Sequence, residues 1–145
     1  MFTSLTKQAF PVLRYRTRDL TRLLPGTARL AMRRMEKITG RNDDMIILRG
    51  VNLFPTQIEE LVLGIPELSP HFVLELTRSG RLDALTVRVE RRPDAVAETS
   101  ERGAELLVKY VKERIGTTVA VTLVDAGTLA RSEGKLKRLY DLRDA

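Results

Sequence analysis

From residue 45 onward, the apolar residues change their spacing in a fixed order, and this order limits the chain to a few folds. Apolar positions recur at helical spacing over residues 58–65 and again over residues 104–115. Residues 72–76, 85–89 and 119–123 instead place apolar side chains at every second position. Helical spacing predicts an amphipathic helix, and alternation predicts a strand with one buried face. The sequence therefore predicts helix, strand, strand, helix and strand in that order.

Turn and capping residues fit the ends of these elements. The apolar run Met45–Leu48 is followed by a turn and by a return strand that begins at Leu53, which predicts a small hairpin. Pro55 suits the first turn of a helix, because its missing N–H would be unpaired there anyway. Gly116 suits the end of the second helix. We therefore expect an α+β fold, with a small mixed sheet, helices on one face of it, and a β-hairpin ahead of it.

The positive charge of the chain is concentrated before this ordered part. Residues 1–37 carry nine basic and two acidic groups, a net charge of +7, whereas the other residues carry sixteen basic and seventeen acidic groups, a net charge of −1. Residues 10–15 and 20–24 favour short strands, and residues 31–39 a linker or a further short strand. Short strands without a covering helix cannot build a stable core. We expect this segment to be the edge of another sheet.

Cysteine is absent, and His71 is the only histidine. Disulfides, thiolate zinc sites and cysteine nucleophiles are therefore excluded, and so is a metal site with several histidines. A serine–histidine–aspartate triad would need His71, whose neighbours favour a structural position at a strand entry. No apolar run approaches the length of a membrane span, and residues 1–7 lack the apolar core of a secretory signal. We expect a cytoplasmic protein with no membrane partner.

Three short runs are unusual for a purely structural domain. Tyr15–Asp19 (YRTRD) mixes arginines with a carboxylate, and Gly40–Asp44 (GRNDD) lies between the charged segment and the ordered part. Arg131–Lys135 (RSEGK) falls in a predicted loop, ahead of a tail that we expect to become a short basic helix. A lysine beside a glycine in a loop can reach far, and its ammonium group suits a phosphate. By spacing alone none of the runs is specific, because each also fits a solvated turn.

Together the three runs resemble motifs of the adenylate-forming enzymes, and within these the phenylacetate–coenzyme A ligase family. Tyr15–Asp19 resembles their Tyr-Arg-Thr-Gly-Asp motif, and Gly40–Asp44, with the hairpin and helix after it, resembles their Gly-Arg-x-Asp-Asp hinge motif. Ser132–Lys135 resembles the terminal motif that carries the catalytic lysine. Arg18 in place of the common glycine, and the inserted Glu133, point to the phenylacetate branch. The resemblance covers nearly the whole chain.

The resemblance implies the lid domain of a two-step ligase. A carboxylate attacks the α-phosphate of ATP and releases pyrophosphate, and the thiol of coenzyme A then displaces AMP from the acyl-adenylate. The small C-terminal domain rotates between the steps, which needs a hinge of only a few residues. By position, Lys135 would neutralise charge at the attacked phosphate, and Asp43 would be the hinge. Asp19 and Arg41 would hold the ribose hydroxyls of ATP.

The same resemblance assigns the hairpin turn to the coenzyme A step. Gly50 would line the channel of the pantetheine arm, where the absence of a side chain permits close approach. Arg49 and Asn52 flank this glycine and are further candidates for binding coenzyme A. Mg²⁺ would be bound mainly by the phosphates of ATP and by residues outside this chain, so no metal ligand is expected within it.

Two parts of such a ligase have no counterpart in this sequence. We find neither a glycine-, serine- and threonine-rich loop for the triphosphate nor an apolar pocket for an aryl acid such as phenylacetate. We therefore expect residues 1–39 to be the end of a large N-terminal domain, the partner of this chain, and residues 40–145 to be the mobile lid. The chain alone would be inactive. Strands near residues 10–24 would be disordered or paired with a second copy in a homodimer.

Two other functions fit part of the pattern. The element order from residue 45 is close to a ferredoxin-like binding module, a fold that serves RNA binding and small-ligand regulation. RNA-binding forms stack bases on aromatic residues of their central strands, but here the predicted strands offer only Phe72. We therefore expect no nucleic-acid partner. The third alternative is a separate regulatory subunit that docks onto a ligase domain.

Overall fold

The computed structural model describes residues 3–4, 6, 9, 11–131 and 137–143. The chain divides into two compact units, unit 1 from Met1 to Asp44 and unit 2 from Met45 to Ala145. The functional boundary that the sequence predicts after residue 39 stays a prediction.

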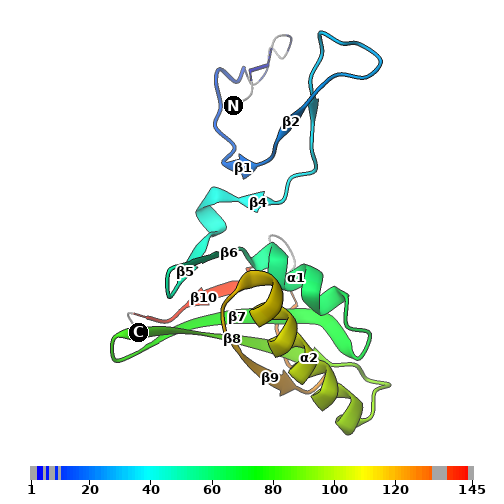
Figure 1. Ribbon diagram of the computed structural model, residues 1–145, viewed down its shortest axis with the longest axis vertical. Coiled ribbons are helices and arrows are strands. Elements are labelled where there is room, and N and C mark those ends of the chain that lie inside the picture. Colours follow the sequence, from blue (N-terminus) through cyan, green and yellow to red (C-terminus); the bar gives the residue numbers. More distant parts are fainter. Residues whose placement is uncertain (1–2, 5, 7–8, 10, 132–136, 144–145) are drawn as a thin grey trace. The chain divides into compact units, whose positions relative to one another are not determined.

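A four-stranded mixed sheet forms the centre of unit 2 (Figure 1). Its two long strands pair in antiparallel fashion, while each outer strand runs parallel to its neighbour. The order across the sheet is β10, β7, β8 and β9, with the bounds β7 Leu68–Ser79, β8 Leu82–Arg91, β9 Ala120–Val124 and β10 Leu139–Asp141. The mixed α+β fold that the sequence predicts is confirmed.

Two helices cover one face of this sheet, α1 (Pro55–Leu63) and α2 (Ala97–Ile115) (Figure 1). The side chain of Gln57 accepts a hydrogen bond from the backbone N–H of Phe54 at 2.9 Å and so caps the start of α1. Gly116 ends α2 in the left-handed conformation, with φ 86°, which glycine adopts without a steric penalty. In the part of the chain that the structure describes, neither helix is long and apolar enough to cross a bilayer.

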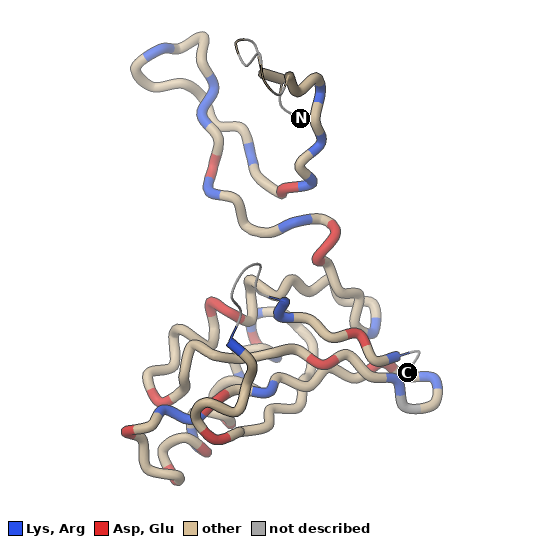
Figure 2. Tube along the Cα trace, turned by 180° about the vertical axis from the view of Figure 1, so that it is seen from behind, with Lys and Arg blue, Asp and Glu red and all other residues tan. Residues whose placement is uncertain are grey.

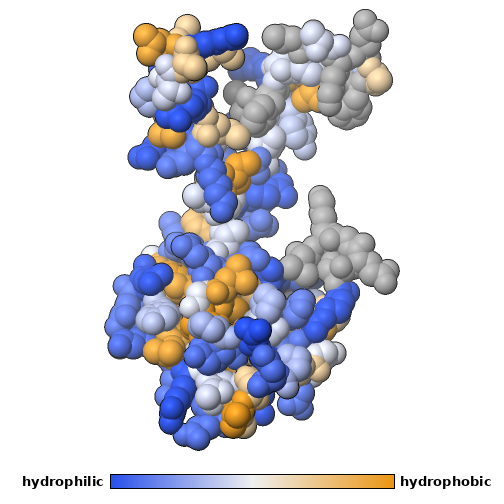
Figure 3. Space-filling model, turned by 90° about the vertical axis from the view of Figure 1, so that its right-hand side faces the viewer, coloured by the Kyte–Doolittle hydropathy of each residue, from blue (hydrophilic) through white to orange (hydrophobic). Residues whose placement is uncertain are grey.

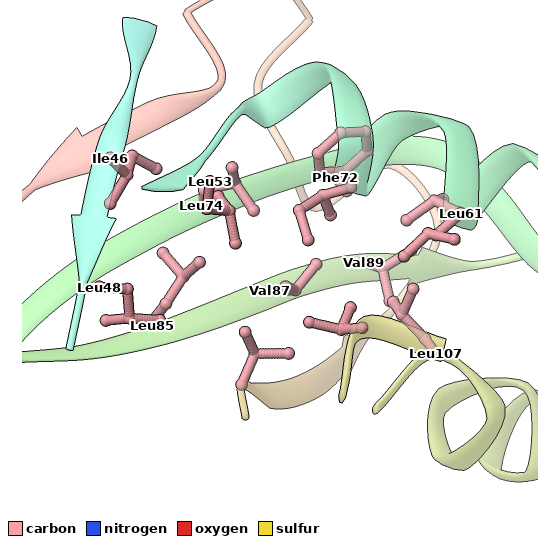
Figure 4. Packing of buried hydrophobic residues seen from close by; sticks show 14 of the residues in the cluster. Ile46, Leu48, Leu53, Leu61, Phe72, Leu74, Leu85, Val87, Val89 and Leu107 are labelled. Atoms are coloured by element: carbon pink, nitrogen blue, oxygen red, sulfur yellow. The ribbon is translucent and has the colours of Figure 1, made fainter. Parts of the chain in front are cut away.

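The core of unit 2 lies between the sheet and the helices (Figure 4). Alternate residues of β7 and β8 point into it, because successive side chains of a strand point to opposite faces. Leucine, isoleucine and valine make up nearly all of it, and the fully buried members include Leu48, Leu53, Ile58, Leu74, Val87, Val89, Leu107 and Val111.

A separate two-stranded hairpin precedes α1, with strands β5 (Ile46–Leu48) and β6 (Val51–Leu53). Arg49 and Gly50 form its two-residue turn with φ angles of 51° and 83°. Positive φ at both positions is typical of the type I′ turn, whose twist matches that of the strands. The predicted hairpin is confirmed. A ferredoxin-like fold would place the strand before α1 inside the main sheet, so the hairpin argues against the binding-module alternative.

The last strand is not expected from the sequence. The tail is predicted to be a loop and a short basic helix, but Leu139–Asp141 pairs with β7 as β10. Backbone bonds of 2.7 Å, from Leu74 N–H to the Arg138 carbonyl and from Leu142 N–H to the Leu76 carbonyl, hold it in place. Without β10, this edge of β7 would expose unpaired N–H and C=O groups. Tertiary pairing therefore outweighs the local preference of the tail.

Unit 1 is an irregular two-stranded ribbon rather than a packed domain. It contains β1 Asp19–Leu20, β2 Leu23–Leu24, β3 Arg34–Met35, β4 Gly40–Arg41 and the 3₁₀ turn η1 Asn42–Asp44. β1 pairs with β4 and β2 pairs with β3, both antiparallel. The strand predicted over residues 20–24 is therefore split in two. The strand predicted over residues 10–15 is wrong for residues 11–15, which form only an isolated bridge at Tyr15, since Arg14 has a positive φ of 50°.

No residue that the structure describes in unit 1 is buried. Large apolar side chains lie open on its surface (Figure 3), and Leu13 and Leu30 are 78% and 87% exposed. Lysine and arginine recur along this unit, whereas both signs of charge are interspersed in unit 2 (Figure 2). A segment of this kind cannot be stabilised by its own apolar contacts.

Candidate functional site

The first two motif runs pair with each other in unit 1. Asp19 in β1 lies opposite Arg41 in β4, and the backbone N–H of Asn42 donates to the carbonyl of Arg18 at 2.8 Å. Antiparallel pairing thus brings together residues that lie far apart in the sequence. The register places the end of the first run beside the start of the second.

Four charged side chains meet at this point, and we call Arg18, Asp19, Arg41 and Asp43 the charge cluster. Arg41 Nη2 lies 3.0 Å from Asp43 Oδ2, and Arg41 Nε lies 4.0 Å from Asp19 Oδ1. Arg18 Nη1 lies 3.8 Å from the same Asp43 oxygen. Exposed ion pairs of this kind contribute at most about 1 kcal/mol to folding. The carboxylates of the cluster are partly exposed and can accept hydrogen bonds from hydroxyl groups.

The backbone at Arg18 is unusual for its residue type. Its φ of 65° lies in the left-handed region, which glycine enters freely and other residues enter at a cost of about 1 kcal/mol or more. The motif that this run resembles has glycine at this position, a residue that enters the left-handed region without a steric penalty. Arg18 adopts the left-handed conformation and places its guanidinium group beside Asp43.

The three candidate residues for coenzyme A lie in the β5–β6 hairpin of unit 2. Arg49 Nε donates to the backbone carbonyl of Asp83 at 3.0 Å, which ties the turn to the start of β8. A Cβ atom on Gly50 would meet no atom within 4 Å, so the tip of the turn faces open space. Asn52 is exposed and pairs with Ile47.

Lys135, the predicted catalytic lysine, lies outside the described residues, as do Ser132, Glu133 and Gly134. The structure thus brings Asp19, Arg41 and Asp43 together, and gathers Arg49, Gly50 and Asn52 in one hairpin. The role of each of these residues stays a prediction.

A buried carboxylate that the sequence does not predict, that of Glu90 in β8, contacts residues 129 and 131. Glu90 is only 1% exposed, and it forms two 2.9 Å hydrogen bonds to the guanidinium of Arg131. Burial would raise the pKa of Glu90, but hydrogen bonds from Arg131 and from the backbone of Gly127 and Leu129 outweigh it and lower the pKa to about 2. In the sequence, Glu90 reads as an ordinary outward residue of an alternating strand, so only the contact with residues 127–131 reveals it.

No cluster of three or more histidine, cysteine, aspartate or glutamate side chains that could hold a metal ion occurs among the residues with a described position.

The comparison with protein families gives the class of the protein. Residues 50–143 match the AMP-binding enzyme C-terminal domain. The chain belongs to this family.

Within the family, the similarity to one kind of ligase is extensive. The chain is 51% identical to the phenylacetate–coenzyme A ligase of Escherichia coli over 99% of its own length and 33% of that relative. It therefore spans about a third of the length of the curated relatives it matches.

Solved structures agree with this similarity. A domain of phenylacetate–coenzyme A ligase from Bacteroides vulgatus superimposes with a TM-score of 0.63 at 35% identity, covering 70% of this chain and 94% of that one. A 2-hydroxyisobutyryl-CoA ligase bound to 2-HIB-AMP and CoA gives a TM-score of 0.65 at 29% identity, covering 72% of this chain and 22% of that one.

The Glu90–Arg131 pair predicts how stability depends on pH. Glu90 has a pKa of about 2 when folded and an ordinary value of 4.5, so the unfolded chain binds the proton more tightly. The stabilisation is complete above pH 4.5 and is lost as pH falls toward 2, a difference of about 3 kcal/mol. We expect Glu90→Gln to remove this part of the pH dependence in urea denaturation. The control is Glu98→Gln, which changes an exposed carboxylate on α2. Equal pH dependence in Glu90→Gln and the unaltered chain would contradict the assignment.

Proposed function

We propose that this chain is the lid domain of an ATP-dependent phenylacetate–coenzyme A ligase. The register of β1 and β4, which gathers the charge cluster from two separate motif runs, is the observation that carries the proposal. The extended similarity to phenylacetate–coenzyme A ligases supports the same reaction. The acid first forms an acyl-adenylate with release of pyrophosphate, and the thiol of coenzyme A then displaces AMP to form the thioester.

In this proposal the charge cluster binds the nucleotide. The carboxylate of Asp19 accepts hydrogen bonds from the ribose hydroxyls, and Arg41 supports it from the opposite strand. Asp43, two residues beyond the end of β4 and inside the 3₁₀ turn η1, is the hinge. A 3₁₀ turn holds few backbone hydrogen bonds, so a rotation there breaks little structure.

Different parts of the chain act in the two steps of the reaction. Lys135 places its ammonium group beside the α-phosphate and the attacking carboxylate during adenylation. Gly50, flanked by Arg49 and Asn52, lies along the pantetheine arm of coenzyme A during thioester formation. Mg²⁺ is held by the phosphates of ATP and by residues outside this chain.

The partner in this proposal is the large domain of the same ligase. Residues 1–39 are the last strands of that domain, which explains why their described side chains are not buried. The triphosphate loop and the pocket for the aryl acid belong to the large domain. A cytoplasmic location and a homodimer stay predictions.

The role of Lys135 is tested in the complete ligase, in which the large domain is followed by this chain. We expect Lys135→Ala to lower the rate of adenylation about 10²- to 10³-fold, because a cation aimed at developing charge contributes about that much. Thioester formation from supplied acyl-adenylate should be unchanged. The control is Lys109→Ala, an exposed lysine on α2. An unchanged rate of pyrophosphate release in Lys135→Ala would contradict the proposal.

The role of the hairpin turn is tested with a pair of glycines. Gly50 and Gly80 both have positive φ, 83° and 62°, and a Cβ on either would meet no atom within 4 Å. Alanine at either position therefore introduces similar backbone strain in a hairpin turn. We expect Gly50→Ala to slow thioester formation about tenfold or more, since a small displacement near reacting groups is costly, while adenylation continues. Gly80→Ala should leave both steps unchanged, and equal losses in the two variants would refute the assignment.

A further inference from the structure

The Glu90 carboxylate is buried on the sheet face opposite the helices. Val87 and Val89 point from β8 into the core, so Glu90 points the other way. Its Oε1 accepts hydrogen bonds from the backbone N–H of Leu129 and from Arg131 Nη1, and its Oε2 accepts one from Arg131 Nη2, each at 2.9 Å. This is the bidentate geometry in which arginine binds a carboxylate most specifically.

Stabilisation of the ionised form of Glu90 does not by itself show that the fold needs a charged group at this position. Replacing a buried ion pair with apolar residues of similar size is often neutral or stabilising, so a buried pair is weak evidence for a role in stability. What Glu90 does fix is the path of residues 127–131, which form neither helix nor strand. Leu129 is the only one of these five residues that is buried.

Arg138, three residues after Lys135 in the sequence, is also paired with a carboxylate. Arg138 Nη2 lies 2.5 Å from Glu59 Oε1 on α1, and the Arg138 guanidinium lies 4.3 Å from the centre of the Phe72 ring. The carbonyl of Arg138 also accepts a bond from the N–H of Leu74 at 2.7 Å. Two arginines, one on each side of Lys135, are therefore bound to carboxylates of the folded body.

Chain length then limits where Lys135 can go. It is four residues from Arg131, a distance that an extended chain spans in at most about 14 Å. If Arg131 were released, residues 127–131 would gain conformational freedom, and the lysine would spend less time at any one place.

We propose that Glu90 and Arg131 are a positioning pair that acts through Lys135. The inference rests on the proposed function and deepens it, because it assigns to these residues a role in adenylation but no contact with the nucleotide. Because Lys135 acts only in the first step, loss of the contact between Glu90 and Arg131 lowers the rate of adenylation and leaves thioester formation intact. A purely structural role would affect both steps alike.

A double-mutant cycle in the complete ligase tests the pair. We expect Arg131→Ala to lower the adenylation rate about 10- to 100-fold, with no further loss when it is added to Lys135→Ala. Thioester formation from supplied acyl-adenylate should be unchanged. Arg102→Ala, which removes an exposed arginine paired with Glu98 on α2, is the matched control and should change neither step.

The outcomes separate the two proposals. If Lys135→Ala lowers adenylation but Arg131→Ala does not, or if the two losses multiply, the positioning pair is refuted and the proposed function stands. If Lys135→Ala has no effect, both are refuted. Should Arg131→Ala fail to fold, Arg131→Lys keeps the charge but cannot form two parallel hydrogen bonds. It should show the same pattern with a smaller loss, and a loss of equal size in both steps would overturn the inference.

Discussion

The one-sided burial of the β7–β8 hairpin beneath α1 and α2 is the constraint on which the rest of unit 2 depends. Because strand residues alternate between faces, filling the core from one face leaves the other face to polar side chains. That second face carries the Glu75–Arg88 ion pair, with 2.8 Å between its atoms, and the buried Glu90. The segment before Lys135 therefore meets a carboxylate there rather than an apolar surface.

In unit 1, backbone pairing and exposed ion pairs, rather than apolar burial, define the described structure. It lacks a core among its described residues, and its strands are two residues long. Its defining feature is a register that aligns Asp19 with Arg41. Ion pairs at this exposure add little to stability, and under the proposed function the cluster binds the ribose of ATP. Under the proposed function, unit 1 becomes stable as part of a larger sheet.

Much of unit 2 could be predicted from the sequence, because its local signals agree with its tertiary structure. The alternation in β7 and β8, Pro55 at the start of α1 and Gly116 at the end of α2 each specify their element locally. β10 could not be predicted in this way, since its three residues form a strand only because the edge of β7 is available. The strand predicted over residues 10–15 is wrong at residues 11–15 for a different reason, because the positive φ of Arg14 turns the backbone away from an extended strand.

The candidate site was accessible to sequence analysis only through its motifs. The resemblance predicts that Asp19 and Arg41 bind one ligand, but the register that makes them neighbours is seen only in the structure. Glu90 carries no local signal at all, because its importance comes from Arg131, which lies 41 residues further along the chain. Contacts over such separations depend on the whole fold.

The central claim is that this chain contributes a cation to a nucleotide held by another polypeptide segment. The most direct measurement is pyrophosphate release from ATP and phenylacetate by this chain alone, compared with the same chain carrying Lys135→Ala and with the complete ligase. The claim predicts no difference between the two isolated chains and clear release by the complete ligase. Release by the isolated chain that depends on Lys135 would contradict it.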